Sequence, residues 1–280
     1  MSRFPEDLLG RARDIHSEIP RWRFRIDRIG GVGIAIPVAL GDLKVVGRAS
    51  VLVGLPGERR GVDLSRENEA LLTMAGHPPE RIVVGAIERM VERLPYATSL
   101  EVRLRFTALM DGEPYDVRMF SRRESDRLVS GTSVRVVGAT ACPCSQELIR
   151  TFLRSRKRRE VSDLVGTHTQ RSVGLLKIVV EGEPPSHLRM ARIIEEAMSS
   201  PTRTLLKRPE EATLVMQMIE NPKLTEDVLR DILAGVVREF RELKNALVFA
   251  CVRSMESVHK HDLYAERKAT IRDLLEEVGG

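Results

Sequence analysis

The chain has 280 residues, a length that suits one large domain or two modules of about 140 residues each. Apolar residues make up 42% and charged residues 30%, which excludes a collagen-like or a disordered chain. The longest unbroken apolar run, 246–252, is too short to cross a bilayer, and charged residues interrupt 1–18, where a signal core would stand. We therefore expect a cytoplasmic protein with no membrane partner.

The formal charge is +5, from 45 basic and 40 acidic residues, and only eight of the basic residues are lysines, which leaves 37 arginines. Arginine can grip phosphate with two hydrogen bonds at once, so this bias suits a phosphate-rich ligand, although genome composition or heat adaptation is the simpler main cause. Three cysteines cannot build a disulfide framework, and Cys142 and Cys144 are too close in the chain for an unstrained bridge. Reduced thiols are expected.

The first half of the chain predicts the order strand, strand, helix, helix, strand, strand. Alternating residues predict strands within 22–55 and at 100–106 and 115–121, and helical periodicity predicts helices at 67–75 and 79–94. Asp111-Gly112, between the last two strands, is a strong signal for a hairpin turn.

The second half repeats much of this order after a charged stretch at 121–127. It predicts strands at 129–139, 172–181 and 246–252, and helices at 188–198 and 225–245. The fold class is therefore expected to be α+β, with two similar units, 1–125 and 126–280, that combine mainly antiparallel sheets with paired helices.

A Cys-Pro-Cys sequence, Cys142 to Cys144, directly follows a predicted strand. Thiols at a strand end can present one sulfur to a metal, whereas on these residues alone both can equally be small buried apolar groups. A closed structural zinc site needs four Cys or His ligands with paired spacings, and the chain has no second Cys pair. Any metal site must therefore recruit His or a carboxylate, which is typical of an open, catalytic site.

His168 and Glu195 are candidates for that recruitment. His168 lies just before the next strand, and consecutive strands often pair, which would bring it near Cys142, although a histidine in a polar loop is often simply solvated. The helical period places Glu195 on an apolar stripe and Glu196 on the polar face. A buried carboxylate needs a cation, a metal or a hydrogen-bond donor, unless Glu195 only marks the frayed edge of the stripe.

Three further segments gather polar and charged residues. Acids and bases cluster at 205–211, and His259 and His261 alternate along an extended segment and therefore face the same side. Three arginines surround a glycine loop at 59–66, a pattern that suits an anion cradle. Each segment by itself is more typical of a solvated surface.

Together these segments carry a family resemblance that runs in order over nearly the whole chain. The matching motifs are Glu-Ile-Pro (18–20), Arg-Gly-x-x-x-Ser-Arg (60–66), Cys-Pro-Cys (142–144), His-x-Gln-Arg (168–171), Leu-Leu-Lys-Arg-Pro-Glu-Glu (205–211), Asn-Pro-Lys-x-x-Glu-Asp-Val (221–228) and Glu-Ser-Val-His-x-His (256–261). The chain resembles the GTP cyclohydrolase IB family, and its archaeal members most of all.

The resemblance implies a fold of tandem tunnelling-fold (T-fold) modules, with the metal site in the C-terminal module. It also implies a homo-oligomer, a dimer or tetramer, with active sites at subunit boundaries. The catalytic metal ligands of the family would carry over to Cys142, His168 and Glu195. They would hold one divalent metal, Fe(II) by preference and Zn or Mn as alternatives, that activates water for attack on carbon eight of the purine of GTP.

The family's guanine-anchoring acid would correspond to Glu210 or Glu211, of which Glu211 is the better match. A carboxylate suits guanine because it accepts hydrogen bonds from the ring N–H and from the exocyclic amine. Further substrate-binding residues implied by the motifs are Lys207, Arg208, His259, His261, Arg60, Ser65, Arg66, Gln170 and Arg171.

Two departures from the family pattern bear on the product. Asp63 stands where the family usually has His, which puts the role of that loop in doubt, and the stretch between Cys144 and His168 is longer than in bacterial members. The length favours the archaeal product, 7,8-dihydroneopterin 2',3'-cyclic phosphate, with formate released, as the first step of pterin synthesis toward tetrahydromethanopterin or folate. The alternative product is the 7,8-dihydroneopterin triphosphate of bacterial members.

Two other functions compete with this interpretation. A nitrile reductase of the same fold would use a thiol nucleophile and a nicotinamide cofactor, but no segment resembles its cofactor motif. A nucleic-acid-binding protein would use the basic run 154–159, which contains no aromatic residue to stack on a base. A solvated helix face is the preferred interpretation of that run, and no stable nucleic-acid partner is expected.

Overall fold

The computed structural model describes residues 11–156 and 164–279, and the chain forms two compact units. Unit 1 consists of Met1–Leu104 and Phe120–Leu128, and unit 2 of Arg105–Met119 and Val129–Gly280. Three strands, β4 (Leu100–Met110), β5 (Glu113–Glu124) and β6 (Arg127–Ala141), contribute residues to both units. The boundary expected between 125 and 126 stays a prediction.

Unit 1 combines antiparallel strands with two helices that pack on each other. Its remaining elements are η2 (Ile15–Ser17), β1 (Ile26–Ile29), β2 (Val32–Leu40), β3 (Leu43–Leu55), α1 (Leu64–Leu72) and α2 (Pro79–Arg93). Alternate residues of β2 and β3 are buried, as in Ile36, Val38 and Val51, because side chains of a strand point to opposite faces of the sheet. The two helices lie close to their predicted positions.

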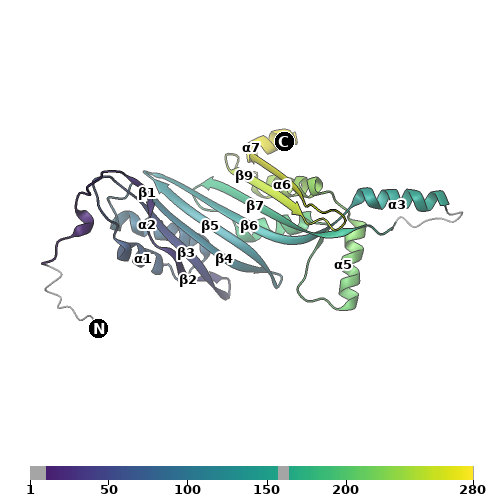
Figure 1. Ribbon diagram of the computed structural model, residues 1–280, viewed down its shortest axis with the longest axis horizontal. Helices are drawn as coiled ribbons and strands as arrows, with labels where there is room; N and C mark the ends of the chain where they lie inside the picture. The colour runs from purple at the N-terminus through teal and green to yellow at the C-terminus, as the bar shows by residue number, and fades with distance from the viewer. Residues whose placement is uncertain (1–10, 157–163, 280) are drawn as a thin grey trace. The chain divides into compact units, whose positions relative to one another are not determined.

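Unit 2 is built on the antiparallel strand order β6-β7-β9-β10, of which Figure 1 labels the first three. The short β8 pairs with β6. Its remaining elements are α3 (Pro143–Arg156), β7 (Thr169–Glu181), α4 (His187–Ala197), β8 (Ser200–Pro201), α5 (Arg208–Glu220), α6 (Thr225–Phe240), β9 (Leu247–Ser254), β10 (Leu263–Thr270) and α7 (Ile271–Glu277). Helix α6 packs against α4 and β9, which places the helices on one face of these strands.

Helix α4 lies unusually close to the sheet. A Cβ atom at Gly174 of β7 would lie 2.4 Å from Cγ2 of Ile194, and one at Gly138 of β6 would lie 2.4 Å from Cγ of Met198. Only glycine leaves room for this approach, because real Cβ atoms do not come so near other heavy atoms. The two glycines therefore fix the depth at which α4, and with it Glu195, lies over the strands.

The α+β class with antiparallel sheets is confirmed, and so is the hairpin turn, in which Asp111 and Gly112 have φ values of 52° and 84°. Some expectations need correction. The helix expected at 225–245 ends at Phe240, since the chain turns back through 241–246. The α-helices and strands that were not predicted are α3, β8, α5, β10 and α7. Strand β10 is largely exposed and α5 buries no residue, so neither shows the apolar periodicity that marks an element in sequence.

Helices α3 and α5 stand at the end of unit 2 where β6 ends and β7 begins (Figure 1). No helix in the described part of the chain is both long enough and apolar enough to span a membrane.

Candidate functional site

Cys142 and His168 lie side by side at one end of the paired strands β6 and β7. The register pairs Ala141 with Thr169, so the next residue on either strand extends the same ladder. The backbone N–H of Cys142 donates to the carbonyl of His168 at 3.1 Å, and the hydroxyl of Thr167 donates to the carbonyl of Cys142 at 2.7 Å. The proximity that strand order predicted is therefore present, and it is fixed by backbone geometry.

The Cys142 thiol lies at the start of α3. Its Sγ accepts a hydrogen bond from the backbone N–H of Ser145 at 3.5 Å, and the side chain is half-buried, whereas Cys144 is exposed. Helix α3 is anchored nearby by the buried Gln146, whose Nε2 donates to the carbonyls of Val165 (3.0 Å) and Ile219 (2.8 Å). The turn that presents Cys142 is thus tied both to the loop before β7 and to the end of α5.

The imidazole of His168 is held from one side. Its Nδ1 lies 3.0 Å from Oε1 of Gln170, and the amide Nε2 of Gln170 donates to Thr140 Oγ1 (3.1 Å) and to Glu256 Oε1 (3.3 Å). The Glu256 segment is held in turn by a backbone bond from Met255 to Arg171 at 2.9 Å. The Nε2 atom of His168 is the nitrogen that this arrangement leaves for a ligand.

A buried chain of hydroxyl groups continues from Gln170 into the core. Thr140 Oγ1 and Ser172 Oγ are 2.8 Å apart, Ser172 Oγ and Ser254 Oγ are 2.7 Å apart, and Thr225 Oγ1 donates to Ser254 Oγ at 2.9 Å. All four residues are buried, so these bonds satisfy polar groups that water cannot reach. The chain links β6, β7, β9 and the start of α6, and it is joined to His168 through Gln170.

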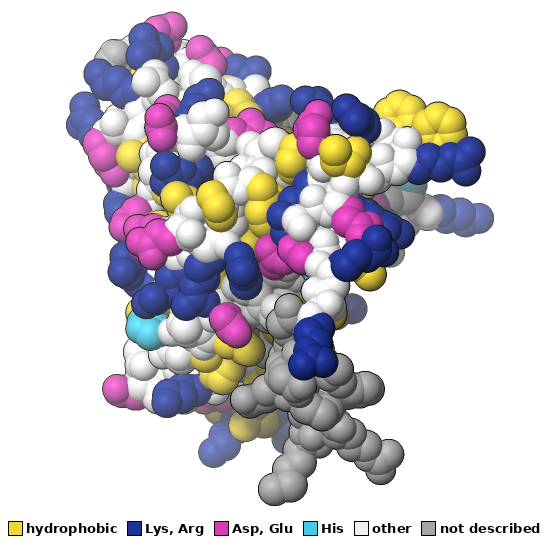
Figure 2. All heavy atoms as spheres, turned by 90° about the vertical axis from the view of Figure 1, so that its left-hand side faces the viewer, with side chains coloured by type: hydrophobic (Ala, Val, Ile, Leu, Met, Phe, Trp, Pro, Cys, Tyr) yellow, Lys and Arg dark blue, Asp and Glu magenta, His cyan; other side chains and the backbone are white. Residues whose placement is uncertain are grey.

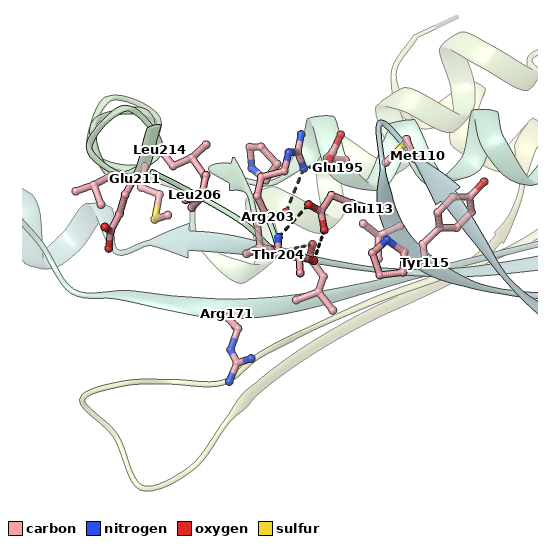
Figure 3. Close-up of a pocket in the computed structure, with 17 residues that line it drawn as sticks. Met110, Glu113, Tyr115, Arg171, Glu195, Arg203, Thr204, Leu206, Glu211 and Leu214 are labelled. Atoms are coloured by element: carbon pink, nitrogen blue, oxygen red, sulfur yellow. Dashed lines mark hydrogen bonds and ion pairs between the residues drawn. The ribbon is translucent and has the colours of Figure 1, made fainter. Parts of the chain in front are cut away.

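A pocket of about 530 Å³ opens in unit 2 and is lined by carboxylates, arginines and apolar side chains (Figure 3). This volume is in the usual range for a small-molecule site. Its lining includes Glu113, Glu195, Glu211, Arg171, Arg203, Leu206 and Leu214. Three of the predicted site residues, Glu195, Glu211 and Arg171, therefore belong to one cavity.

Glu195 forms an ion pair in this pocket. Arg203 donates from Nη1 to Oε1 of Glu195 at 2.7 Å, and the side chains are 26% and 17% exposed, respectively. Glu196, its neighbour on α4, instead points to the surface, where it pairs with Arg238 at 3.3 Å. The helical period thus separates the two carboxylates as the sequence predicted, and Glu195 has the partner that a largely buried charge needs.

Glu113, at the start of β5, holds the loop before α5 through two hydrogen bonds. Its carboxylate accepts from the backbone N–H of Thr204 at 2.9 Å and from the Thr204 hydroxyl at 2.7 Å (Figure 3). These two bonds, assisted by the nearby Arg203 charge, hold the pKa of Glu113 below its ordinary value. The two bonds fix the segment that carries Arg203 toward Glu195.

Tyr115 forms a wall of the same pocket and is itself fixed. Its hydroxyl hydrogen-bonds to Nδ1 of His187 at 2.8 Å, and Phe106 meets the His187 ring edge-on. Burial lowers the pKa of His187 to about 4, so the ring is neutral at physiological pH. This wall therefore adds no charge to the pocket.

Glu210 and Glu211 have different surroundings at the start of α5. The Glu210 carboxylate accepts from the backbone N–H of Lys207 at 2.7 Å, which is the N-terminal bond of a capping box. Glu211 lines the pocket, and so do Leu206 before it and Leu214 after it in the chain. The structure thus uses Glu210 to begin the helix and leaves Glu211 facing the cavity.

The remaining predicted substrate contacts of unit 2 are exposed. Lys207 and Arg208 lie at the exposed start of α5, and His259 and His261 stack on each other, with ring centroids 5.4 Å apart, in the loop between β9 and β10. That loop bends, although the sequence predicted an extended segment. Arg171 borders the pocket, and Figure 3 shows its side chain directed away from the Glu195–Arg203 pair.

Arg60, Ser65 and Arg66 belong to unit 1, where internal ion pairs neutralise the arginine loop. Arg60 forms an ion pair with Glu18 at 3.0 Å. Asp63 forms ion pairs with Arg59 at 3.0 Å and with Arg66 at 3.8 Å. Figure 2 likewise shows acidic side chains interspersed among the basic ones on the face that it displays. Asp63, which departs from the family pattern, is therefore the counter-charge of the predicted anion cradle.

Part of the basic run 154–159 lies outside the described residues. Helix α3 ends at Arg156, whose guanidinium lies 4.7 Å from the ring centroid of Phe152. The predicted solvated helix face accordingly stays a prediction beyond that residue.

The donor types at the strand ends fit a divalent metal. Cys142 and His168 offer sulfur and nitrogen, the ligands that zinc and iron accept, and His168 keeps Nε2 for this purpose. Among the described residues, however, no three Cys, His, Asp or Glu side chains gather closely enough to hold a metal together. Glu195 is bonded to Arg203 and lines the pocket, whose lining includes neither Cys142 nor His168, so the ligand set stays a prediction.

Sequence reasoning missed several residues of this site. Arg203 and Glu113 lie in a loop and at a turn, where no periodicity marks a side chain as inward-facing. Thr140, Ser172 and Ser254 occupy buried positions of strands whose buried residues are mostly apolar. A polar residue at such a position is the signal that could have found them.

The chain matches the family model described as "Type I GTP cyclohydrolase folE2" over residues 12–265. It is 43% identical to the GTP cyclohydrolase MptA of Korarchaeum cryptofilum over 283 residues, which cover 99% of each chain. It is 30% identical to the GTP cyclohydrolase MptA of Thermoplasma acidophilum, with 93% of this chain and 96% of that protein covered.

Among solved structures, the chain is similar to the uricase from Arthrobacter globiformis. The TM-score is 0.53 with 6% sequence identity, and the alignment covers 87% of this chain and 93% of the uricase. Identity this low speaks for a shared fold and not for a shared activity.

Proposed function

This chain belongs to the type I GTP cyclohydrolase family, and on that premise we propose that it opens the guanine imidazole ring of GTP and releases formate. The product is proposed to be 7,8-dihydroneopterin 2',3'-cyclic phosphate. The observation that carries the proposal is the match of the whole chain to a relative named GTP cyclohydrolase MptA, at 43% identity. The alternative product is 7,8-dihydroneopterin triphosphate.

One divalent metal is proposed to be held by Cys142, His168 and Glu195, with Fe(II) favoured over Zn or Mn. When bound, such a metal with an open coordination position supplies a water activated at neutral pH. The adjacency of Cys142 and His168 and the free Nε2 of the histidine support this assignment. Glu195 is placed over the strands by α4 and would exchange its bond with Arg203 for the metal.

Glu211 is proposed to recognise the guanine edge. Its place in the lining of the pocket and the capping role of Glu210 both support this choice between the two acids. A carboxylate there accepts hydrogen bonds from the ring N–H and the exocyclic amine, and it rejects purines that lack those donors. Leu206 and Leu214 offer apolar surface for the flat ring system.

The triphosphate is proposed to meet the exposed basic residues at the pocket margin. Lys207 and Arg208 begin α5, and Arg171 borders the same cavity. Arginine and lysine in such positions neutralise phosphate charge, and arginine adds paired hydrogen bonds. His259 and His261 are proposed to exchange protons with the phosphates or the ribose.

We further propose that residues 1–125 and 126–280 form tandem tunnelling-fold modules and that the chain assembles into a dimer or tetramer with active sites at subunit boundaries. Exposed apolar side chains support an additional contact, since Leu148 and Phe152, one turn apart on α3, are 72% and 52% exposed. Light scattering of the purified protein should give the mass of a dimer or tetramer. A monomer at all concentrations would contradict this part of the proposal.

Anaerobic incubation with GTP and ferrous iron tests the reaction. Formate, pyrophosphate and a fluorescent pterin with a cyclic phosphate are the expected products after oxidation for detection. A pterin that keeps its triphosphate would replace the proposed product by the bacterial one. An absence of formate with every divalent metal tried would contradict the proposed reaction itself.

A further inference from the structure

We infer that Gln170 is a positioning residue, which holds the imidazole of His168 with its proton on Nδ1 and its lone pair on Nε2. Glu256 sets the orientation of the Gln170 amide that this role requires. The inference rests on the proposed function in one respect: it takes His168 as a metal ligand. The hydrogen-bond geometry that carries it is independent of any metal.

The amide of Gln170 is fully engaged by the protein. Its Oε1 lies 3.0 Å from His168 Nδ1, and its Nε2 donates to Thr140 Oγ1 at 3.1 Å and to Glu256 Oε1 at 3.3 Å. An amide nitrogen has two hydrogens, and both are used by these two acceptors. No donor remains to contact a substrate, so the sequence-based expectation of substrate binding by Gln170 gives way to this role.

Glu256 determines which way the amide faces. An ionised carboxylate only accepts hydrogen bonds, so the NH₂ group of Gln170, and not its oxygen, must lie toward Glu256. The oxygen then faces His168, where it can only accept, and the Nδ1 of the histidine must donate. A neutral imidazole carries one N–H, so Nε2 keeps the lone pair that a metal ligand requires.

The buried hydroxyl chain gives this arrangement a rigid base. Thr140 Oγ1 accepts from Gln170, and Ser172 Oγ lies 2.8 Å from it. Ser172 Oγ also lies 2.7 Å from Ser254 Oγ, which accepts from Thr225 at 2.9 Å. Because these hydroxyls are buried, the bonds cannot be exchanged for water without cost, so they hold the Gln170 side chain in place while Glu256 sets which way its amide faces.

The tautomer of His168 can be read directly in the metal-free protein. Two-bond nitrogen–proton couplings in ¹⁵N-labelled histidine distinguish a proton on Nδ1 from one on Nε2, at an alkaline pH where the ring is neutral. The wild-type protein should show His168 with its proton on Nδ1. The variant Gln170→Leu removes the acceptor, and His168 should shift toward the Nε2-protonated form, which is favoured in free imidazole side chains.

Metal affinity and substrate kinetics provide the second readout. Titration with Co²⁺ as a spectroscopic probe should show binding to Gln170→Leu weakened about 10- to 100-fold, the usual effect of removing a group that orients a ligating histidine. The KM for GTP should stay within about twofold of the wild-type value, because the amide donors do not reach the substrate. Activity should recover at high metal concentration.

A second variant, Glu256→Gln, keeps the inference testable if the Gln170→Leu protein does not fold. It leaves His168 and Gln170 intact but lets the Gln170 amide rotate, so a mixture of both His168 tautomers is expected. Glu242→Gln, at an exposed position outside this network, is the matched control and should match the wild type in both readouts.

Three outcomes would overturn the inference. They are a wild-type His168 with its proton on Nε2, an unchanged tautomer in both Gln170→Leu and Glu256→Gln, and a raised KM for GTP with unchanged metal binding in Gln170→Leu. If the tautomers follow the expectation but His168→Ala still binds Co²⁺ normally, the positioning role stands and the proposed metal site fails. The two hypotheses are therefore distinguishable.

Discussion

Arg203 donates a hydrogen bond to the Glu195 carboxylate at 2.7 Å. The same carboxylate is the one that the family resemblance implies as a metal ligand. The pair gives a largely buried acid the cation that it needs, so Glu195 is stable on α4 without any metal. In the proposed metal site, a metal at Cys142 and His168 would therefore have to compete with Arg203 for this carboxylate. The competition leads to two of the predictions below.

The first prediction concerns the metal ligands. Metal content should fall strongly in each of Cys142→Ala, His168→Ala and Glu195→Ala, because each removes one of the three proposed protein ligands. Elemental analysis of the purified variants measures it. Glu196→Ala is the matched control, since Glu196 is next to Glu195 but pairs with Arg238 on the surface, and it should keep its metal. Full retention in all three ligand variants would sink the assignment.

The second prediction concerns Arg203→Met. Without metal, this variant leaves Glu195 unpaired in a largely buried position and should lose about 1 to 3 kcal/mol of unfolding free energy. Adding metal should raise its melting temperature more than that of the wild type, because the metal meets no competing cation at Glu195.

The control for that experiment is Arg238→Met, which breaks the surface pair with Glu196 and should change stability very little. Equal melting shifts on metal addition in Arg203→Met and the wild type would show that Glu195 and Arg203 do not exchange with the metal.

The contrast between Glu195 and Glu196 also shows what the sequence could predict. The helical period of 3.6 residues assigned the two acids to opposite faces, and strand adjacency brought His168 to Cys142, because both rules depend on regular backbone geometry. Arg203 could not be found this way, since it lies in an irregular loop whose position is set by the distant Glu113 through Thr204.

Helix α5 illustrates a second limit of sequence patterns. It buries no residue, so it has no apolar stripe, and only its Pro and Glu residues at the start indicate a helix. The distinction between Glu210 and Glu211 depended on knowing where that helix begins. Once the capping bond from Lys207 to Glu210 is visible, the two acids have separate roles.

The third prediction concerns pH and unit 1. The Glu67 side chain of α1 is completely buried, and this burial raises its pKa to about 7 from 4.5, more than the backbone N–H of Gly31 lowers it. The folded state thus binds a proton that the unfolded state has lost between these values. The unfolding free energy should therefore fall as the pH rises from about 4.5 to about 7, on the order of 3 kcal/mol in total.

Glu67→Gln should remove this decline and stabilise the protein above neutral pH, because the amide has the same shape and no charge. Denaturant unfolding at a series of pH values measures the effect. Glu69→Gln on the same helix is the control, since Glu69 is exposed and pairs only loosely with Arg93 at 3.5 Å. A decline of equal size in Glu67→Gln and the wild type would assign the pH dependence to other groups.

The last prediction separates the two acids at the start of α5. Glu211→Gln should bind GTP more weakly by about 2 to 4 kcal/mol, because a charge-assisted pair of hydrogen bonds to the guanine edge is lost and one amide N–H would face a donor. Its metal content should stay normal, since Glu211 is not among the proposed ligands. Glu210→Gln should instead lose about 1 kcal/mol of helix stability, because the Glu210 carboxylate caps the backbone N–H of Lys207, and it should bind GTP nearly normally.

Calorimetric titration with GTP measures the affinity of both variants, and elemental analysis measures their metal content. If Glu211→Gln bound GTP normally but lost its metal, or if only Glu210→Gln showed the binding defect, the guanine anchor would have to be moved.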